Sequence, residues 1–254
     1  MRNISGSTLK IIAVITMLID HIGAIVLNNI LIDNGLNDIM LSNNSVLIET
    51  WINNNPVYSI MIIMRFIGRV SFPIFCFLLV EGFYKTRNVI KYLLRLSIFA
   101  ILSEIPFDLA IYGKIVSIES QNIFFTLTIG LLFITILQYI YNKNYKYSFI
   151  LDIIVITIGF IVSELLKVDY SGIGFLVIIG IYLVKRHYKN NANTNLYSII
   201  TACIVLFIYN PIELGAFISI PIIIGYNGKR GLTLKYIFYA FYPIHLLILW
   251  LLII

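Results

Sequence analysis

The stretch LKIIAVITMLIDHIGAIVLNNIL, residues 9–31, decides the fold class because it is long and apolar enough to cross a bilayer as one helix. Such a helix needs about 20 apolar residues to span roughly 30 Å of hydrocarbon. Of the 254 residues, 60% are hydrophobic and 12% are charged, and the mean hydropathy is +0.95. Soluble domains are about a quarter charged. The composition therefore excludes a soluble enzyme, a disordered protein and a simple nucleic-acid binder, and it predicts an all-α, polytopic transmembrane helical bundle.

Nine apolar segments qualify as candidate spans, and the sixth to eighth are short enough to be broken or tilted. They are Leu9–Leu31, Val57–Tyr84, Val89–Tyr112, Asn122–Tyr141, Tyr147–Leu166, Gly172–Val184, Leu196–Tyr209, Pro211–Tyr226 and Tyr236–Ile254. Residues 32–56 form the only long connection, which is rich in Asn, and we expect an external loop there. Because no repeat or separate soluble domain is visible, we expect residues 1–254 to form a single integral-membrane domain.

Lysine and arginine gather on alternate connections between these segments. If the N-terminus is cytoplasmic, the cytoplasmic side holds 14 of the 18 Lys and Arg residues. Only Lys114 and Lys167 then face outside, and Arg65 and Arg69 lie within a span. Cytoplasmic loops of membrane proteins carry an excess of basic residues. The pattern predicts a cytoplasmic N-terminus and an external C-terminus, and it explains the net charge of +6 without nucleic acid.

Charged residues within the spans are candidates for function, because they are costly in lipid and usually face the bundle interior. At about 1.5 Å per residue, His21, Arg69 and His245 lie roughly 14–18 Å from an end of their spans, near the midplane. Asp20 neighbours His21, and neighbours on a helix diverge, so we expect Asp20 to meet Arg69 instead. A structural histidine is the alternative for His21, but the surrounding charges favour a reactive group.

A second set of charges lies nearer the outer surface. Arg65 and Glu104 reach similar depth in the outer half, which makes them a candidate ion pair. Such a pair would hold the bundle together as readily as it would serve chemistry. The two cysteines, Cys76 and Cys203, lie in apolar runs and are expected to be buried hydrophobes, so we expect no disulfide and no metal site.

Two predicted cytoplasmic segments combine glycine with basic residues, Glu81-Gly82-Phe83-Tyr84-Lys85-Thr86-Arg87-Asn88 and Tyr226-Asn227-Gly228-Lys229-Arg230-Gly231. Backbone N–H groups and cations at helix ends suit a phosphate. Ordinary anchoring at the cytoplasmic face explains the basic residues equally well, but it leaves the glycines and the Asn unexplained.

Motifs along the whole chain resemble the TraX family, named for the protein linked to N-terminal acetylation of F-pilin. The matching residues are Leu9–Ala13 with Asp20-His21-Ile22, Arg65–Arg69 with Ser71–Phe75, Glu81-Gly82-Phe83, Thr86-Arg87-Asn88 with Arg95-Leu96, Ser103–Phe107, Asn122 with Phe125-Thr126-Leu127, Asp169-Tyr170, Tyr226–Gly231 and Phe241–Leu246. The resemblance runs in order from residue 9 to about residue 250. It departs mainly at residues 32–56, where this chain has its own Asn-rich connection, so the acceptor could differ from pilin.

The family resembles, distantly, membrane acyltransferases that carry acetyl groups from cytoplasmic acetyl-CoA to acceptors outside, beside a histidine within a helix. The resemblance implies a multi-pass protein of the cytoplasmic membrane that uses acetyl-CoA as co-substrate and needs no metal. It implies an acceptor that is a pilin, a peptide or another exported molecule, and an N-terminal amine rather than a hydroxyl.

The resemblance also implies roles for individual residues. His21 is expected as the general base, with Asp20 beside it and Arg69 and Tyr242 stabilising the oxyanion. The acceptor side is expected at Arg65, Glu104, Asn122 and His245. The phosphates of acetyl-CoA are expected at the glycine-containing basic segments, at Glu81, Arg87, Asn227, Lys229 and Arg230.

Three other functions stay open at this point. An ion-coupled transporter also places Arg, Asp, Glu and His at the midplane, although no inverted repeat is visible between the two halves. A structural subunit of conjugation or secretion would not need His21 at all. An O-acetyltransferase acting on a cell-surface glycan would share the donor and differ only in the acceptor.

Overall fold

The computed structural model describes residues 3–189, 191–232 and 235–254, and over these ranges the chain is helical with no extended strand. Arg2, one of the basic residues counted above, lies outside these ranges. The helices are α1 (Gly6–His21), η1 (Ile22–Leu27), α2 (Asn28–Asp33), α3 (Leu36–Leu41), α4 (Ser45–Asn54), α5 (Pro56–Gly68), α6 (Ser71–Lys85), α7 (Val89–Tyr112), α8 (Ile123–Lys143), α9 (Ser148–Leu165), α10 (Ser171–His187), α11 (Thr194–Tyr209), η2 (Pro211–Ile218), α12 (Ser219–Ile224) and α13 (Lys235–Leu251). The predicted all-α class is confirmed.

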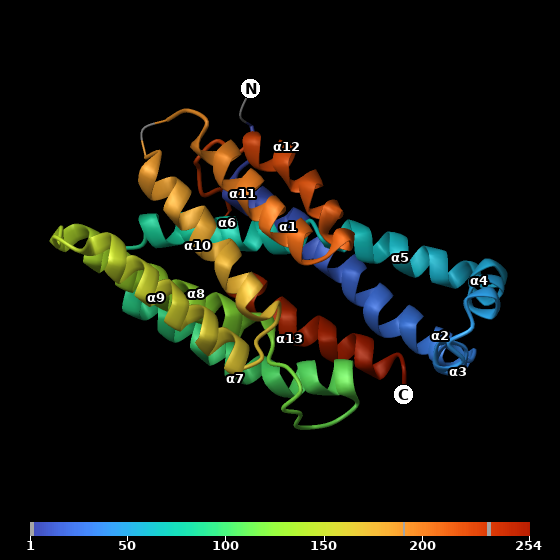
Figure 1. Cartoon of the computed structure of the whole chain (residues 1–254). Coiled ribbons are helices and arrows are strands. Elements are labelled where there is room, and N and C mark those ends of the chain that lie inside the picture. The colour runs from blue at the N-terminus through green and yellow to red at the C-terminus, as the bar shows by residue number, and fades with distance from the viewer. Residues whose placement is uncertain (1–2, 190, 233–234) are drawn as a thin grey trace.

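Among the described residues, four helical segments are long and apolar enough to cross a membrane. They are Gly6–Asp33, Pro56–Lys85, Ile123–Lys143 and Ser148–Leu165, and shorter apolar helices cover Thr194–Tyr209, Pro211–Ile224 and Tyr236–Leu251. These helices are those of a membrane protein. The beginning of α1 and the end of α13 lie toward opposite ends of the bundle (Figure 1). Nine spans with the N-terminus inside stay a prediction.

The first apolar segment changes helix type at its centre. Ser5 caps α1 by accepting a hydrogen bond from the Thr8 backbone N–H at 3.2 Å. Immediately after His21, η1 continues as a π-helix before α2 resumes the α-helical path. Single π-helical turns are rare and occur frequently at functional sites. The change of helix type therefore draws attention to His21.

The second apolar segment, expected as the span Val57–Tyr84, is interrupted by a turn in the structure. α5 ends at Gly68 and α6 begins at Ser71, with a turn at Arg69 and Val70 between them. Pro73 cannot donate a backbone hydrogen bond to the Arg69 carbonyl, which explains the break. A Cβ added at Gly68 would lie 2.3 Å from the Asp20 Cβ, so glycine allows α5 to approach α1 closely here.

The connection at residues 32–56 and the eighth predicted span also differ from a plain loop and a plain α-helix. Residues 32–56 are not a plain loop, because they contain α3 and α4; the Asn44 side chain caps α4 by accepting from the Val46 and Leu47 backbone N–H groups. The α3–α4 pair lies at the end of the molecule beside α2 (Figure 1). The eighth predicted span changes helix type, because the 3₁₀-helix η2 is followed directly by α12.

Helices distant in the sequence pack side by side around α1. α13, the last helix, lies against α7 and also contacts α1 and η1. Figure 1 shows α13 running along the bundle between α7 and α1. The two midplane histidines predicted on the first and last spans are thereby brought to neighbouring helices.

Candidate active site

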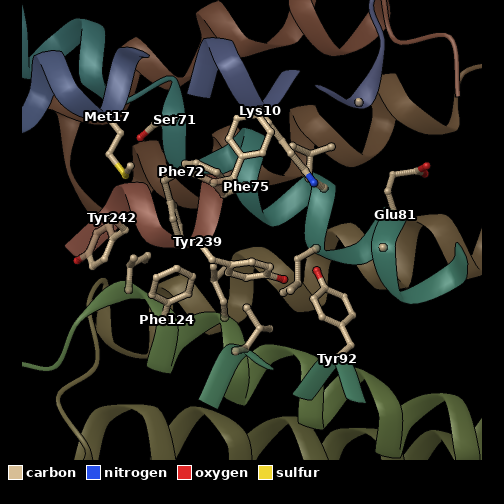
Figure 2. Close-up of a pocket in the computed structure, with 18 of the residues that line it drawn as sticks. Lys10, Met17, Ser71, Phe72, Phe75, Glu81, Tyr92, Phe124, Tyr239 and Tyr242 are labelled. Carbon is tan, nitrogen blue, oxygen red and sulfur yellow. The ribbon is translucent and has the colours of Figure 1, made fainter. Parts of the chain in front are cut away.

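A cavity of about 680 Å³ lies among α1, α6, α7, α8 and α13. Pockets of 300–1,000 Å³ are typical of small-molecule sites. In Figure 2, Tyr242, Phe124 and Met17 line one end, Lys10, Tyr92 and Glu81 line the other, and Tyr239 lies between them. His21 lines the cavity, as do the basic residues Lys10, Lys85, Arg87, Arg95 and Arg230. The cavity thus joins a histidine to a group of cations.

His21 and His245 form a hydrogen-bonded pair. The His21 Nδ1 atom lies 2.7 Å from the His245 Nε2 atom, and the two rings are nearly parallel, with an interplanar angle of 13°. The His245 Nδ1 atom lies 2.8 Å from the Phe241 carbonyl oxygen. The shared layer predicted for these two histidines is confirmed.

The partners of the pair assign its tautomers when both rings are neutral. A carbonyl only accepts, so His245 Nδ1 carries a proton and His245 Nε2 is an acceptor. His21 Nδ1 must then donate to His245 Nε2, which leaves His21 Nε2 without a proton. His21 lines the cavity, whereas His245 is 4% exposed and does not. The pair therefore presents an unprotonated ring nitrogen, the form that a general base requires.

An ion-pair network holds the residue next to His21. Asp20 Oδ1 accepts from Arg69 Nη2 at 2.6 Å, and Asp20 Oδ2 accepts from Arg65 Nη1 at 2.5 Å. Arg69 also donates to Glu213 Oε1 at 2.9 Å and to the Tyr170 hydroxyl at 3.1 Å. The predicted contact between Asp20 and Arg69 is confirmed. Because α1 cannot rotate without breaking this network, it also fixes the direction of His21.

The predicted ion pair between Arg65 and Glu104 is wrong. Arg65 contacts Asp20, and Glu104 instead accepts a short hydrogen bond from the Asn122 side-chain amide. Asn122 also donates to the Ala100 carbonyl at 2.7 Å and caps α8 by accepting from the Phe124 backbone N–H at 3.0 Å. Similar depth did not decide the pairing, because depth does not say which way a side chain faces. Glu104 and Asn122 join α7 to α8, and neither lines the cavity.

Some of the residues predicted to bind the phosphates of acetyl-CoA line the cavity, and others do not. Arg87 and Arg230 line the cavity. Glu81 also lines it, but its carboxylate is paired with Lys85 at 2.7 Å and Lys185 at 2.5 Å. Lys85 also donates to the Gly228 carbonyl at 2.8 Å. Glu81 therefore holds Lys85 and Lys185 in place at this end of the cavity.

Lys229 and Asn227 do not line the cavity. The Asn227 side chain accepts from the Lys229 backbone N–H at 2.8 Å, and the Lys229 carbonyl accepts from the Gly6 backbone N–H at 2.8 Å. A Cβ added at Gly231 would lie 2.1 Å from the Ser7 hydroxyl oxygen. Gly231 and Asn227, which membrane anchoring left unexplained, therefore support the beginning of α1.

Comparison with known proteins places this arrangement in a family. The model of the TraX protein family matches residues 5–253, a range that contains all the residues lining the cavity. The chain belongs to the TraX family. It is 29% identical over 272 aligned residues to a probable fimbrial assembly protein FimC, serogroup H1, from Dichelobacter nodosus; the alignment covers 98% of this chain and 96% of the relative. No solved structure gives a significant match.

Arg95 of this TraX-family chain lines the cavity, although the sequence suggested only a cation near the membrane surface. Its Cζ atom lies 5.6 Å from the centre of the Tyr92 ring. Its Nε atom is buried and has no hydrogen-bond partner among the described residues. A buried guanidinium N–H without a partner is suited to an anion. The signal available in the sequence was its position about two turns into α7, beyond Lys91.

Asp169 and Tyr170 also line the cavity, and the sequence gave them a place in a motif but no role. They precede α10, in the connection from α9. The Tyr170 ring stacks on Phe72 with centroids 4.1 Å apart, and its hydroxyl accepts from Arg69. Burial raises the pKa of Asp169 to about 6, although the nearby Arg69 opposes this shift.

Proposed function

We propose that this TraX-family protein is a membrane acetyltransferase that uses acetyl-CoA from the cytoplasm to acetylate the N-terminal amine of a pilin-like protein or another exported peptide. The observation that carries the proposal is the His21–His245 pair: His21 lines a cavity that cations also line, and its Nε2 atom carries no proton when both rings are neutral. The association of the TraX family with pilin acetylation, and the fimbrial name of the relative from Dichelobacter nodosus, support the acceptor class.

The cavity suits a long anionic donor. Arg87, Arg230 and Arg95 offer cations for the phosphate groups of CoA. Lys10 and His21 both line the cavity and are 11 residues apart on α1, about 16 Å along the helix axis. The cavity is therefore extended along α1, as a linear acyl carrier requires. The aromatic walls between its ends would contact the uncharged pantetheine arm (Figure 2).

In the proposed reaction, His21 Nε2 removes a proton from the acceptor amine as its nitrogen attacks the acetyl carbonyl carbon. The carbon–sulfur bond breaks, and His21 returns the proton to the CoA sulfur. His245 is a positioning residue, because it touches His21 and not the cavity. The Tyr242 ring lies 6.1 Å from the His21 ring, and its hydroxyl is our candidate donor for the oxyanion.

The role that we propose for Arg69 differs from the oxyanion contact that the family resemblance implied. Its Nε, Nη1 and Nη2 atoms all donate to partners within the protein, and it does not line the cavity. We therefore propose that Arg69, with Arg65, holds Asp20 and so orients His21, and that neither arginine contacts the oxyanion.

A label-transfer assay tests the function. Purified protein in lipid nanodiscs is incubated with acetyl-labelled acetyl-CoA and a peptide with a free N-terminus. We expect label in the peptide, stable to hydroxylamine because an amide forms, whereas an ester on a hydroxyl would release it. Absence of any transfer to amine or hydroxyl acceptors would return the chain to the transporter or the structural assembly subunit.

A further inference from the structure

The carboxylates that line the cavity are not alike. Asp20, Glu81 and Asp169 are the acidic residues among the described cavity walls. Asp20 pairs with two arginines, and Glu81 pairs with two lysines. Asp169 forms no ion pair with any described residue, and Arg69, Arg65 and Asp20 are the charged groups around it. Among these three acidic residues, Asp169 is therefore the one whose carboxylate is available to pair with a positively charged ligand.

The backbone holds Asp169 firmly at this place. Its N–H donates to the Gln121 carbonyl at 2.9 Å, and its carbonyl accepts from the Thr126 hydroxyl at 2.7 Å. Both contacts use backbone atoms of Asp169, so its carboxylate takes no part in them. They attach the α9–α10 connection to the beginning of α8.

The same connection contains unusual backbone conformations. Lys167, Tyr170 and Ser171 all have positive φ angles, of 50°, 60° and 49°. Non-glycine residues rarely adopt this region, and such strain persists where the surrounding structure enforces it, often at ligand sites. With the bridge between Gln121 and Val168, these angles turn the chain so that Asp169 and Tyr170 both border the cavity that His21 borders.

The position of the connection favours the acceptor over the donor. In the predicted topology, residues 167–171 join two spans on the external side, opposite to the basic segments. A carboxylate would repel the phosphates of CoA, whereas it would attract a positively charged acceptor arriving from outside. A peptide N-terminus has an ordinary pKa of about 7.7–8.0, so it is mostly an ammonium group at neutral pH.

We propose that Asp169 binds the ammonium group of the acceptor's N-terminus beside His21, and so makes the site selective for amines over hydroxyls; this rests on the acetyl transfer proposed above. His21 Nε2 removes one proton from the bound ammonium, and the neutral nitrogen attacks the acetyl carbon. His21 releases this first proton to solvent, takes up the second N–H proton as the amide forms, and returns it to the CoA sulfur when the carbon–sulfur bond breaks. An acceptor hydroxyl carries no charge to offset that of Asp169, so it binds less well.

A binding experiment without acetyl-CoA tests this role separately from catalysis. The probes are the peptide Gly-Ser-Gly-Ser-amide and its N-acetylated form, titrated into the protein in nanodiscs and followed by thermophoresis. We expect the wild-type protein to bind the free-amine form at least tenfold more tightly. Asp169→Asn should abolish this preference, because it removes the charge and keeps the backbone contacts; Asp169→Ser is the second variant if Asp169→Asn elutes as an aggregate.

Glu119→Gln is the matched control. Glu119 is an exposed carboxylate paired with Lys114 in the connection between α7 and α8, on the same predicted external side. Its loss changes the net charge equally, and the preference should survive. Equal behaviour of the two peptides with wild-type protein, whether both bind or neither does, overturns the proposal. So does a preference that persists in Asp169→Asn, or one that Glu119→Gln also removes. Label transfer can succeed or fail independently of these results.

Discussion

Replacing His21 and His245 singly and together tests the central feature of the site. His21→Asn keeps a polar side chain of similar reach, but an amide takes up no proton at neutral pH. His245→Phe keeps a ring beside Phe241, whose ring centroid lies 4.7 Å from that of His245, and it removes the acceptor for the His21 Nδ1 proton. The first variant removes the proposed base, whereas the second removes only what orients the base.

The expected magnitudes differ for that reason. Loss of a general base costs typically 10²- to 10⁴-fold in rate, which we expect for His21→Asn. A neutral hydrogen bond contributes about 0.5–1.5 kcal/mol net, so His245→Phe should lower kcat roughly 2- to 13-fold. Because His245 acts through His21, His245→Phe should cause almost no further loss when His21 is already Asn.

The assay is label transfer at saturating acetyl-CoA, with size-exclusion profiles and thermal unfolding of every variant as controls for folding. Near-normal transfer by well-folded His21→Asn protein would remove His21 from the mechanism. Fully multiplicative losses in the double variant would show that His245 acts independently of His21, and would refute the relay between the two rings.

Three further predictions concern the donor, the packing and the membrane. Arg95→Gln should raise KM for acetyl-CoA at least tenfold but leave KM for acetyl-pantetheine unchanged, because acetyl-pantetheine lacks phosphate. Lys91→Gln, a change at an exposed residue one turn away, is the control. An equal loss with both donors would exclude phosphate binding by Arg95. Gly68→Ala should lower stability by about 1–3 kcal/mol, since its Cβ would meet Asp20, and a thermal midpoint equal to that of Gly180→Ala would contradict this. A reporter fused after Ile254 should be active only if it works outside the cytoplasm; activity of a cytoplasmic reporter there would reject the predicted orientation.

Part of the site was predictable from the sequence because depth in a membrane follows from position along a helix. Counting residues placed His21 and His245 in one layer, and their hydrogen bond confirms it. The neighbour rule on a helix directed Asp20 toward Arg69 in the same way. The ion pair of Arg65 with Glu104 failed because both residues satisfy the depth argument while facing different helices.

Residues outside regular helices were the ones that sequence reasoning could not place. Asp169 lies at the cavity because of positive φ angles and contacts to Gln121 and Thr126, none of which follows from hydropathy. Lys229 was placed at the phosphates on composition, yet its segment supports α1. Basic residues and glycine suit an anion and a close backbone contact equally, and only the neighbours distinguish the two.

The sequence by itself determined that this is a helical membrane protein of the TraX family, with charged residues buried near its midplane. Apolar runs of this length form membrane-spanning helices, because lipid cannot hydrogen-bond to the backbone and the helix satisfies its own backbone groups. A charged side chain within such a helix needs a partner inside the bundle. The tertiary structure alone decided which partner each charge has, because that depends on the rotation and breaks of each helix. The break before Pro73 and the close approach at Gly68 set Arg69 against Asp20, and the packing of α13 beside α1 pairs His21 Nδ1 with His245 Nε2 at the wall of the cavity.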